Sequence, residues 1–226
     1  MKKIALVVAV EMAAVEEKYG EPVQRIPLAG REAQVFQRGE HQIYVFHSGA
    51  GEIAAAAATQ ALITRFEPDF ILNFGVVGAL TKEMGVQKAC LVERVVHYDF
   101  DTSEFDGCEV GRYMELPDRY IPMDQDLLNK ARAVLPELPL VTCASADKFV
   151  EGPEAKGRLH QEFNADICEM EAAGIALTCW RNKVPCLALK LVSDGVEGGA
   201  EEFTQEFDKA SAACLDLLDK LIDEAF

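Results

Sequence analysis

Hydrophobic runs of strand length alternate with helical segments along most of the chain. Residues 4–10, IALVVAV, form a continuous apolar stretch, which is typical of a strand buried on both faces of a sheet. The segment 89–100 predicts either one long bent strand or a strand pair. Further strands are predicted at 42–51, 69–80, 139–147 and 184–195.

Helical patterns occupy the intervals between these strands. The alanine-rich segment 51–66 predicts a helix, and the apolar residues of 202–225 follow the 3.6-residue period of a packed helix face. Two more helices are predicted at 124–135 and 166–182. The segment 105–124 combines glycines, prolines and aromatic residues without a helical period, which predicts a long functional loop or an interface segment.

This alternation predicts a single three-layer α/β/α domain over residues 1–226, with a central mixed β-sheet. The sequence contains no internal repeat, linker or low-complexity tract that would divide the chain. In such sheets, binding sites gather where strands end and loops begin. The candidate positions of a site are therefore Glu11 and the segments 48–51, 73–78 and 193–195.

The amino-acid composition narrows the classes of molecule that the protein is expected to bind. Half of the 226 residues are hydrophobic and 27% are charged, so the chain can bury a sizeable core and stay in solution. Its formal net charge of −16 repels nucleic-acid phosphates and anionic membrane surfaces. We therefore expect neither a nucleic-acid nor a membrane partner, but a small molecule.

The cysteines and the first residues bear on location. Seven cysteines, an odd number without a C-x-x-C pair, predict buried reduced thiols rather than a disulfide framework. The N-terminal apolar run stops at Glu11 without a small-residue cleavage site, and no stretch approaches the roughly 20 apolar residues of a membrane span. The expected location is the cytoplasm.

Asp194 is the first candidate for chemistry. It stands between Ser193 and Gly195 at the end of an apolar strand, where solvent is reduced. Burial disfavours the charged form of a carboxyl group, and an acid that keeps its proton near neutral pH can protonate a leaving group. The alternative is that Asp194 only caps the segment that follows.

Glu169 and Glu171 are the second candidate. In the predicted helix 166–182 they lie about 200° apart, so one of the two carboxylates points toward the protein body. A buried carboxylate needs donors, and two sugar hydroxyls would serve. A salt bridge to a lysine or arginine elsewhere would serve equally.

Other strand ends carry weaker signals. Phe149 is either a core residue or a platform for a flat base. The turn 48–51 begins a helix, but it lacks the Walker lysine and the full dinucleotide fingerprint, so a tight turn is favoured over a phosphate site. His97, Asp99 and Asp101 alternate without a further clustered ligand, which favours a polar loop over a metal site. We expect neither a metal nor a cofactor.

Taken in order, these segments resemble the purine nucleoside phosphorylase and nucleosidase superfamily, and most of all bacterial 5′-methylthioadenosine/S-adenosylhomocysteine nucleosidases. The resemblance covers nearly the whole chain, and the EMEA and SD elements at their separation are its most specific part. The matching segments are the N-terminal strand, SGAGEIAAA (48–56), NFGVVGAL (73–80), HYDFD (97–101), SADKFV (145–150), EMEAAGIA (169–176), LKLVSDG (189–195) and the C-terminal helix.

The resemblance implies hydrolysis of the N-glycosidic bond of a purine nucleoside. Asp194 would then be the general acid that shares a proton with purine N7, and Glu171 would accept hydrogen bonds from the ribose 2′ and 3′ hydroxyls. The implied substrate contacts are Ser193 beside Asp194, Met170 under the sugar, Phe149 on the base, the backbone of Val150 at the base edge, and Gly75 and Phe203 in the pocket.

The resemblance also implies a homodimer. In the family, the segment that matches 102–113 closes the 5′ pocket of the neighbouring subunit. Phe105 is therefore expected to be a lid residue that acts in trans.

The chain departs from the family at the nucleophile. Family hydrolases hold the attacking water with a glutamate, a serine and an arginine, and the matching positions here are Ala13, Val76 and Lys190. A shift of two residues would bring Glu11 to the first position, although the strand register argues against it. Three explanations stay open: water held by Glu11, Glu169 or Lys190; phosphate as the nucleophile, with Lys190 as one contact; or a nucleoside-binding protein with weak turnover.

Overall fold

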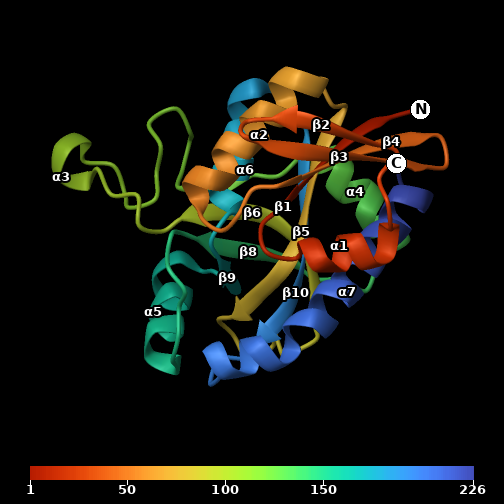
Figure 1. The fold of residues 1–226 in the computed structure, drawn as a ribbon. Coiled ribbons are helices and arrows are strands. Elements are labelled where there is room, and N and C mark those ends of the chain that lie inside the picture. The colour runs from red at the N-terminus through yellow and green to blue at the C-terminus, as the bar shows by residue number, and fades with distance from the viewer.

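One mixed β-sheet runs through the chain, and a computed structural model describes all residues from 1 to 226 (Figure 1). The strands are β1 (Lys3–Val8), β2 (Gln24–Leu28), β3 (Arg31–Arg38), β4 (His41–His47), β5 (Phe70–Ala79), β6 (Ala89–His97), β7 (Tyr120–Pro122), β8 (Leu140–Ser145), β9 (Ile167–Glu169) and β10 (Cys186–Asp194). The helices are α1 (Met12–Tyr19), α2 (Glu52–Phe66), α3 (Ser103–Asp106), α4 (Gln125–Val134), α5 (Pro153–Phe163), α6 (Ala172–Asn182) and α7 (Ala200–Glu224).

Part of the sheet closes on itself. β5 pairs with β9 and β10, β10 also pairs with β6, and β8 joins β6 to β9, so these five strands form a closed ring. Outside the ring, the sheet continues from β5. β1 pairs in parallel with β5, and β4 pairs in parallel with β1. β3 and then β2 follow in antiparallel pairing. Closure leaves no free strand edge within the ring.

Helices cover both faces of the sheet. α2 and α6 pack against each other on one side, where they contact β1, β4, β6 and β8. α7 packs on β5 and β10 on the other side, with α1 and α4 against it (Figure 1). The prediction of an α/β fold with a central mixed sheet is confirmed.

The central strands β5 and β10 combine apolar sequences with buried polar side chains, one in β5 and three in β10. Every residue of β5 and β10 is buried. Lys190, Ser193 and Asp194 of β10 are therefore enclosed with their neighbours rather than exposed to water. Because a buried polar group needs a partner, the ends of these strands are where a site is to be sought.

Seven elements were not predicted from the sequence, the strands β2, β3, β7 and β9 and the helices α1, α3 and α5. The strands β2 and β3 lie at the edge of the sheet, where β2 has no buried residue and β3 is only partly buried, so their side chains are largely polar. The helices α1 and α5 are short and each buries only a few residues. The predicted loop 105–124 contains the strand β7, and its start overlaps the single-turn helix α3.

The prediction of one helix over 166–182 was wrong at its beginning. Residues 167–169 form the strand β9, which pairs with both β5 and β8, and α6 begins only at Ala172. The backbone pairing of a three-residue strand inside the ring overrides the helical pattern of the sequence. The first predicted strand, 4–10, is also shorter, since β1 ends at Val8.

Two further observations concern the whole molecule. None of the helices combines the length and the apolar character needed to cross a membrane. All seven cysteines are free thiols, and all except Cys108 are buried. Six of the seven cysteines are thus part of the packed interior, as predicted, and Cys108 is the exception.

Candidate active site

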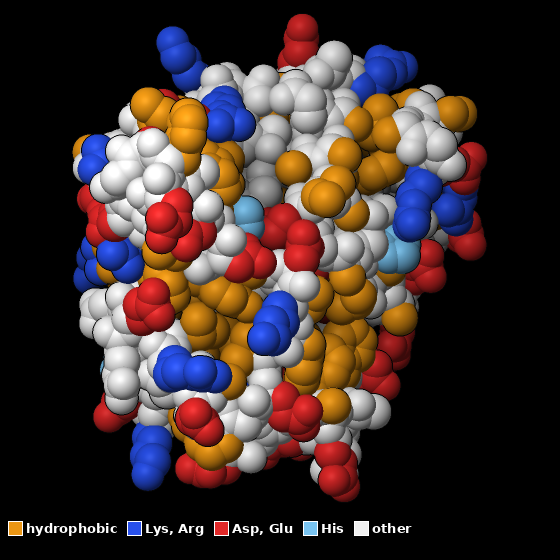
Figure 2. All heavy atoms as spheres, turned by 90° about the vertical axis from the view of Figure 1, so that its left-hand side faces the viewer, with side chains coloured by type: hydrophobic (Ala, Val, Ile, Leu, Met, Phe, Trp, Pro, Cys, Tyr) orange, Lys and Arg blue, Asp and Glu red, His pale blue; other side chains and the backbone are white.

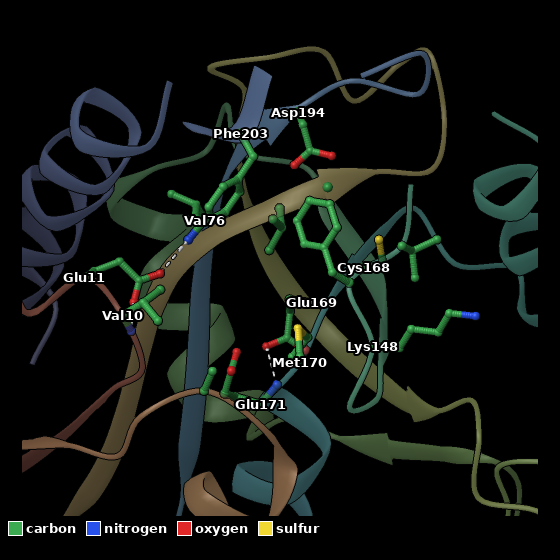
Figure 3. Close-up of a pocket in the computed structure, with 15 residues that line it drawn as sticks. Val10, Glu11, Val76, Lys148, Cys168, Glu169, Met170, Glu171, Asp194 and Phe203 are labelled. Carbon is green, nitrogen blue, oxygen red and sulfur yellow. Dashed lines mark hydrogen bonds between the residues drawn. The ribbon is translucent and has the colours of Figure 1, made fainter. Parts of the chain in front are cut away.

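A cavity opens beside the ends of β5, β9 and β10, and 15 residues line it (Figure 3). Nine of the lining residues are hydrophobic, and acidic side chains provide most of the polar groups. An apolar cavity with a few converging polar groups is typical of a small-molecule site. The sequence-predicted residues among the lining are Glu11, Val76, Phe149, Val150, Glu169, Met170, Glu171, Asp194 and Phe203.

Asp194 lies at one end of this cavity and is almost completely buried (Figure 3). The pairing of β10 with β5 is irregular between Val192 and Asp194, and such an irregularity re-aims a side chain at a strand end. Ser193 Oγ lies 3.0 Å from Asp194 Oδ1, in position to donate to it. On β5, a Cβ added at Gly78 would stand 3.1 Å from Asp194 Oδ2, so glycine leaves room for the carboxyl group.

Lys156 of α5 is the partner of Asp194. Its Nζ lies 2.6 Å from Asp194 Oδ2, 2.6 Å from the carbonyl oxygen of Gly195 and 3.2 Å from that of Gly198. These three acceptors match the three N–H groups of an ammonium, and the lysine side chain is fully buried. Asp194 is therefore not the isolated buried acid that the sequence predicted.

Lys156 was missed from the sequence, although a signal was present. Lys156, Leu159 and Phe163 are the buried residues of α5, at the spacing of one helix face. A lysine on an otherwise apolar helix face indicates a buried acidic partner. Because the helix α5 itself was not predicted, this face could not be recognised.

Glu169 and Glu171 are both buried, which corrects the expectation that only one of them points inward. Glu169 ends β9, and Glu171 is the residue before the first residue of α6, with a non-helical φ of −136°. The 200° separation of a helix therefore does not apply to them. Figure 3 shows Glu171 at the end of the cavity opposite Asp194.

Gly51 holds the carboxylate of Glu171. The N–H of Gly51 donates to Glu171 Oε1 at 2.8 Å. Gly51 has a φ of +101°, and a Cβ there would stand 2.7 Å from Asp147 Oδ1, so this position requires glycine. The turn 48–51 thus binds a carboxylate of the chain itself. Burial and the charge of Glu169 raise the pKa of Glu171 to about 7, against the lowering effect of the Gly51 N–H.

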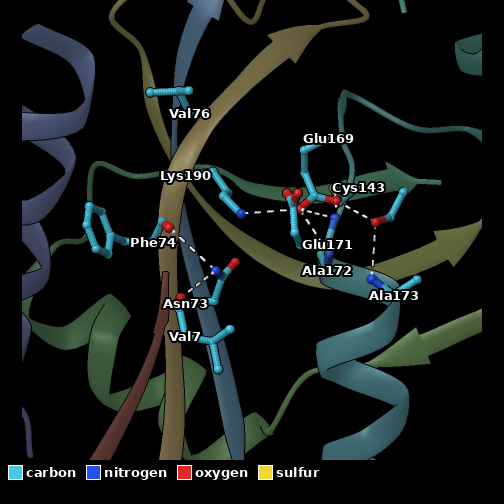
Figure 4. Close-up of polar contacts among 12 residues, drawn as sticks. Val7, Asn73, Phe74, Val76, Cys143, Glu169, Glu171, Ala172, Ala173 and Lys190 are labelled. Carbon is cyan, nitrogen blue, oxygen red and sulfur yellow. Dashed lines mark hydrogen bonds and ion pairs between the residues drawn. The ribbon is translucent and has the colours of Figure 1, made fainter. Parts of the chain in front are cut away.

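Lys190 forms the salt bridge that the sequence left open for this pair of glutamates. Its Nζ lies 3.3 Å from Glu169 Oε2 (Figure 4), and Lys190 is not one of the residues that line the cavity. Burial lowers the pKa of Lys190, but the charges of Glu169, Glu11 and Glu171 raise it above its ordinary value. Lys190 is therefore a charged, occupied partner and not a free cation in the pocket.

Glu11 lines the cavity, and Ala13 does not. Glu11 Oε1 accepts the N–H of Val76 at 3.0 Å, and Oε2 accepts the N–H of Val10 at 3.1 Å. The strand register that argued against Glu11 was wrong because β1 ends at Val8 and the chain turns before α1. Ala13 is exposed on α1. A Cβ added at Gly75 would stand 2.5 Å from Glu11 Oε1, so Gly75 contributes to the site by making room.

Apolar side chains form the walls between the two carboxyl ends. Phe149 is 42% exposed and packs edge-to-face on Phe203 of α7, with ring centroids 5.6 Å apart. It is a wall of the cavity and not a core residue. Val150 is buried beside it, and Met170 lies between Asp194 and Glu171 in Figure 3.

Two sequence candidates lie outside this cavity. Phe105 is on α3, 89% exposed, and does not line the cavity of its own chain. His97 contacts Asp99 through Nε2 at 2.9 Å and the Tyr113 hydroxyl through Nδ1 at 2.7 Å. No group of three or more histidine, cysteine, aspartate or glutamate side chains is arranged to hold a metal ion.

Comparison with known proteins gives consistent matches over nearly the full length. A family model described as "Phosphorylase superfamily" matches residues 3–223. The 5'-methylthioadenosine/S-adenosylhomocysteine nucleosidase of Staphylococcus saprophyticus is 30% identical over 197 residues, covering 83% of this chain and 86% of its own. The aminodeoxyfutalosine nucleosidase of Helicobacter pylori is 29% identical over 226 residues, covering 95% and 94%. The solved structure of Helicobacter pylori 5'-methylthioadenosine/S-adenosylhomocysteine nucleosidase with butyl-thio-DADMe-Immucillin-A is 28% identical over 99% of both chains, with a TM-score of 0.92.

Proposed function

Because the chain belongs to the phosphorylase superfamily, we propose that it hydrolyses the N-glycosidic bond of a purine nucleoside, releasing the free base and a ribose derivative. One observation carries the proposal: two buried carboxyl groups, Asp194 and Glu171, lie at opposite ends of one cavity. The names of the similar proteins support a substrate of the 5′-methylthioadenosine/S-adenosylhomocysteine type.

Asp194 acts on the leaving group. It gives a proton to purine N7 as the bond between C1′ and the base nitrogen breaks, so the base departs as a neutral molecule. The transfer leaves a buried carboxylate, which Lys156 at 2.6 Å and the Ser193 hydroxyl at 3.0 Å stabilise. Lys156 and Ser193 are therefore placed to stabilise the charge that Asp194 acquires when it gives up its proton.

Glu171 binds the sugar. Its Oε2 takes no hydrogen bond from the protein, whereas Oε1 accepts from Gly51, so the carboxylate has capacity left for the ribose 2′ and 3′ hydroxyls. As C1′ gains positive charge, this carboxylate and the polarizable sulfur of Met170 favour the oxocarbenium form. Phe149 stacks on the base beside Phe203, and the backbone of Val150 meets the base edge.

Glu11 positions the attacking water. Its carboxylate faces the cavity, where two backbone N–H groups fix it, and it can take a proton as water adds to C1′. Val76 contributes its N–H to this arrangement, so the loss of a polar side chain at that position leaves the backbone contact in place. Phosphorolysis is the alternative, but Lys190 is paired with Glu169 and supplies no free contact for phosphate.

The active form is a homodimer in this proposal, with residues 102–113 closing the neighbour's 5′ pocket. Phe105 is 89% exposed on α3, which projects from the body of the molecule in Figure 1. Figure 2 shows hydrophobic side chains exposed in several clusters on the face from which α3 projects. Exposed apolar clusters of this kind mark protein–protein contacts. The location proposed is the cytoplasm, where the seven free thiols stay reduced.

Incubation with 5′-methylthioadenosine, in phosphate-free buffer and with added phosphate, tests the reaction. We expect chromatography to show free adenine at the same rate in both, because water is the nucleophile. Adenine that forms only with phosphate would establish phosphorolysis instead. The proposal would be contradicted if 5′-methylthioadenosine, S-adenosylhomocysteine and aminodeoxyfutalosine all bound saturably but released no adenine. The chain would then be a nucleoside-binding protein.

Glu171→Gln is expected to lower turnover by about 10- to 100-fold, since a hydrogen bond to a charged group contributes roughly 1.5–3 kcal/mol. The glutamine oxygen can still accept the Gly51 N–H, so the folded structure should persist. Steady-state kinetics and thermal unfolding on the same sample separate the two effects. Preserved kinetics with a large drop in melting temperature would show a structural carboxylate and remove Glu171 from sugar binding.

A further inference from the structure

Glu52, the first residue of α2, is a buried acid that the proposed reaction does not use. Although Glu52 belongs to α2, its side chain lies at the start of α6, where the first four N–H groups have no partner within the helix and need acceptors. Each of these four N–H groups donates to a side chain. The N–H groups of Glu171 and Ala172 donate to Glu169, that of Ala173 donates to Ser145 Oγ, and that of Gly174 donates to Glu52 Oε2.

The single hydroxyl proton of Ser145 limits how many carboxyl groups in this cluster can be ionised at the same time. Its Oγ is in hydrogen-bond contact with Glu52 Oε1 and lies 2.5 Å from Glu169 Oε1. The same oxygen accepts the N–H of Ala173 at 3.1 Å. A hydroxyl has one proton to donate, so it cannot donate to two ionised carboxylates at once. One of the two carboxyl groups must be protonated and donate to the serine oxygen.

The surroundings decide which carboxyl group holds this proton. Glu169 accepts two backbone N–H groups and lies 3.3 Å from the ammonium of Lys190, and these donors favour its charged form (Figure 4). Glu52 accepts one backbone N–H and has no cationic partner. Burial and the charge of Glu169 raise the pKa of Glu52 to about 8. The proton therefore belongs on Glu52.

The groups around Glu52 are mostly acidic or neutral. They are Glu169 of β9, Glu171 before α6, Asp147 after β8, and the phenols of Tyr98 and Tyr113, with Lys190 of β10 beyond Glu169. Ionisation of Glu52 would add a negative charge among three carboxylates and take away the donor to Ser145. The contacts of the Glu52 side chain with Ser145 and the neighbouring carboxylates therefore require its carboxyl group to be neutral.

Glu52 also ties together the two segments that hold Glu171. Its own N–H donates to Asp147 Oδ1 at 2.7 Å, and the preceding residue, Gly51, donates to Glu171. Across the cluster, its side chain holds Gly174 on the first turn of α6. A Cβ at Gly174 would stand 2.5 Å from the Glu52 carbonyl oxygen, so α2 and α6 meet backbone to backbone here.

We propose that Glu52 carries a proton at neutral pH and, through Ser145 and Gly174, positions the segment that presents Glu171 to the sugar. The positioning role of Glu52 rests on the proposed function, whereas the assignment of a proton to Glu52 does not. Glutamine at position 52 reproduces the protonated form, because its amide can donate to Ser145 Oγ and accept from Gly174.

Thermal unfolding of wild type and Glu52→Gln between pH 5 and pH 9 tests whether Glu52 carries this proton in the folded protein. With its folded pKa above the unfolded value of about 4.5, wild-type Glu52 binds its proton more tightly in the folded state, so wild-type stability falls as pH rises from that value to about 8. Glutamine has no proton to lose. The melting temperature of Glu52→Gln minus that of wild type should therefore increase by about 5 °C or more between pH 5 and pH 9.

The matched control is Glu154→Gln, which removes an exposed carboxylate from the first turn of α5 and should show no such change with pH. A pH-independent difference for Glu52→Gln would overturn the proton assignment. Because unfolding requires no substrate, this result stands apart from any failure to find nucleosidase activity.

Kinetics test the positioning role. Glu52→Ala removes both contacts and should lower kcat/KM by about tenfold or more, as displacement of a substrate-binding group does. Glu52→Gln should restore most of this loss, and the decline of wild-type kcat/KM above about pH 8 should be absent in it. A Glu52→Ala variant with the kcat/KM of wild type, or a Glu52→Gln variant as impaired as Glu52→Ala, would overturn the positioning role.

Discussion

Asp194→Asn is expected to lower kcat by at least about 100-fold, the usual scale for loss of a general acid. Asparagine keeps the size of the side chain and can still accept from Lys156, but it has no acidic proton to give to N7. Without that proton the base must depart as an anion. Release of free base from 5′-methylthioadenosine, followed by absorbance or chromatography, measures the effect.

The control for this variant is Asp208→Asn, which removes an exposed carboxylate from α7 and should leave turnover unchanged. Binding of free adenine to Asp194→Asn, by calorimetry, would show that the pocket is intact. Turnover within a few-fold of wild type would remove Asp194 from acid catalysis, and the proposed mechanism would have to be abandoned.

The fold was predictable where single segments carry their own signal. The strands β5 and β10 are buried on both faces, so their sequences are largely apolar, and α7 has a regular apolar face. The edge strands β2 and β3 have polar sequences and form because β4 offers them a partner. That pairing is a property of the sheet and not of the segment. For the same reason, closure of the ring through β9 could not be foreseen.

The candidate site was predictable at strand ends, because chain direction brings those ends to one edge of a parallel sheet. Asp194 was found in this way, and Glu171 was found for a wrong reason, since it precedes α6 and does not lie within a helix. Contacts between distant segments were out of reach. The pairing of Glu169 with Lys190 joins residues 21 positions apart on different strands, and Ser145 meets Glu52 across 93 positions.

Glu11 shows how a small error in an element boundary changes a functional conclusion. A strand drawn to residue 10 directs Glu11 away from the site, whereas β1 ends at Val8 and the chain turns. The carboxylate then reaches the backbone of Val76 on β5. Boundaries are the least certain part of any pattern-based prediction, and the placement of a candidate residue just after a strand is especially sensitive to them.

Lys156→Met is expected to destabilise the protein by about 3–5 kcal/mol, the usual cost of leaving a buried charge without its partner. Methionine fills much of the space of the lysine chain, so the loss reflects charge rather than a cavity. The remaining polar contact of Asp194 would be the Ser193 hydroxyl. Denaturant unfolding at a fixed protein concentration measures this, with the exposed Lys130→Met on α4 as a control expected to change stability little.

The double variant Lys156→Met/Asp194→Asn separates the ion pair from local packing. If the cost of Lys156→Met comes from an unpaired Asp194 carboxylate, then a neutral amide at position 194 should recover a large part of it, and the double variant should be more stable than Lys156→Met alone. Additive losses in the two single variants would show that Lys156 stabilises the fold through the carbonyl groups of Gly195 and Gly198. In that case Lys156 would not stabilise the protein as the counter-ion of Asp194, and the two residues would act independently.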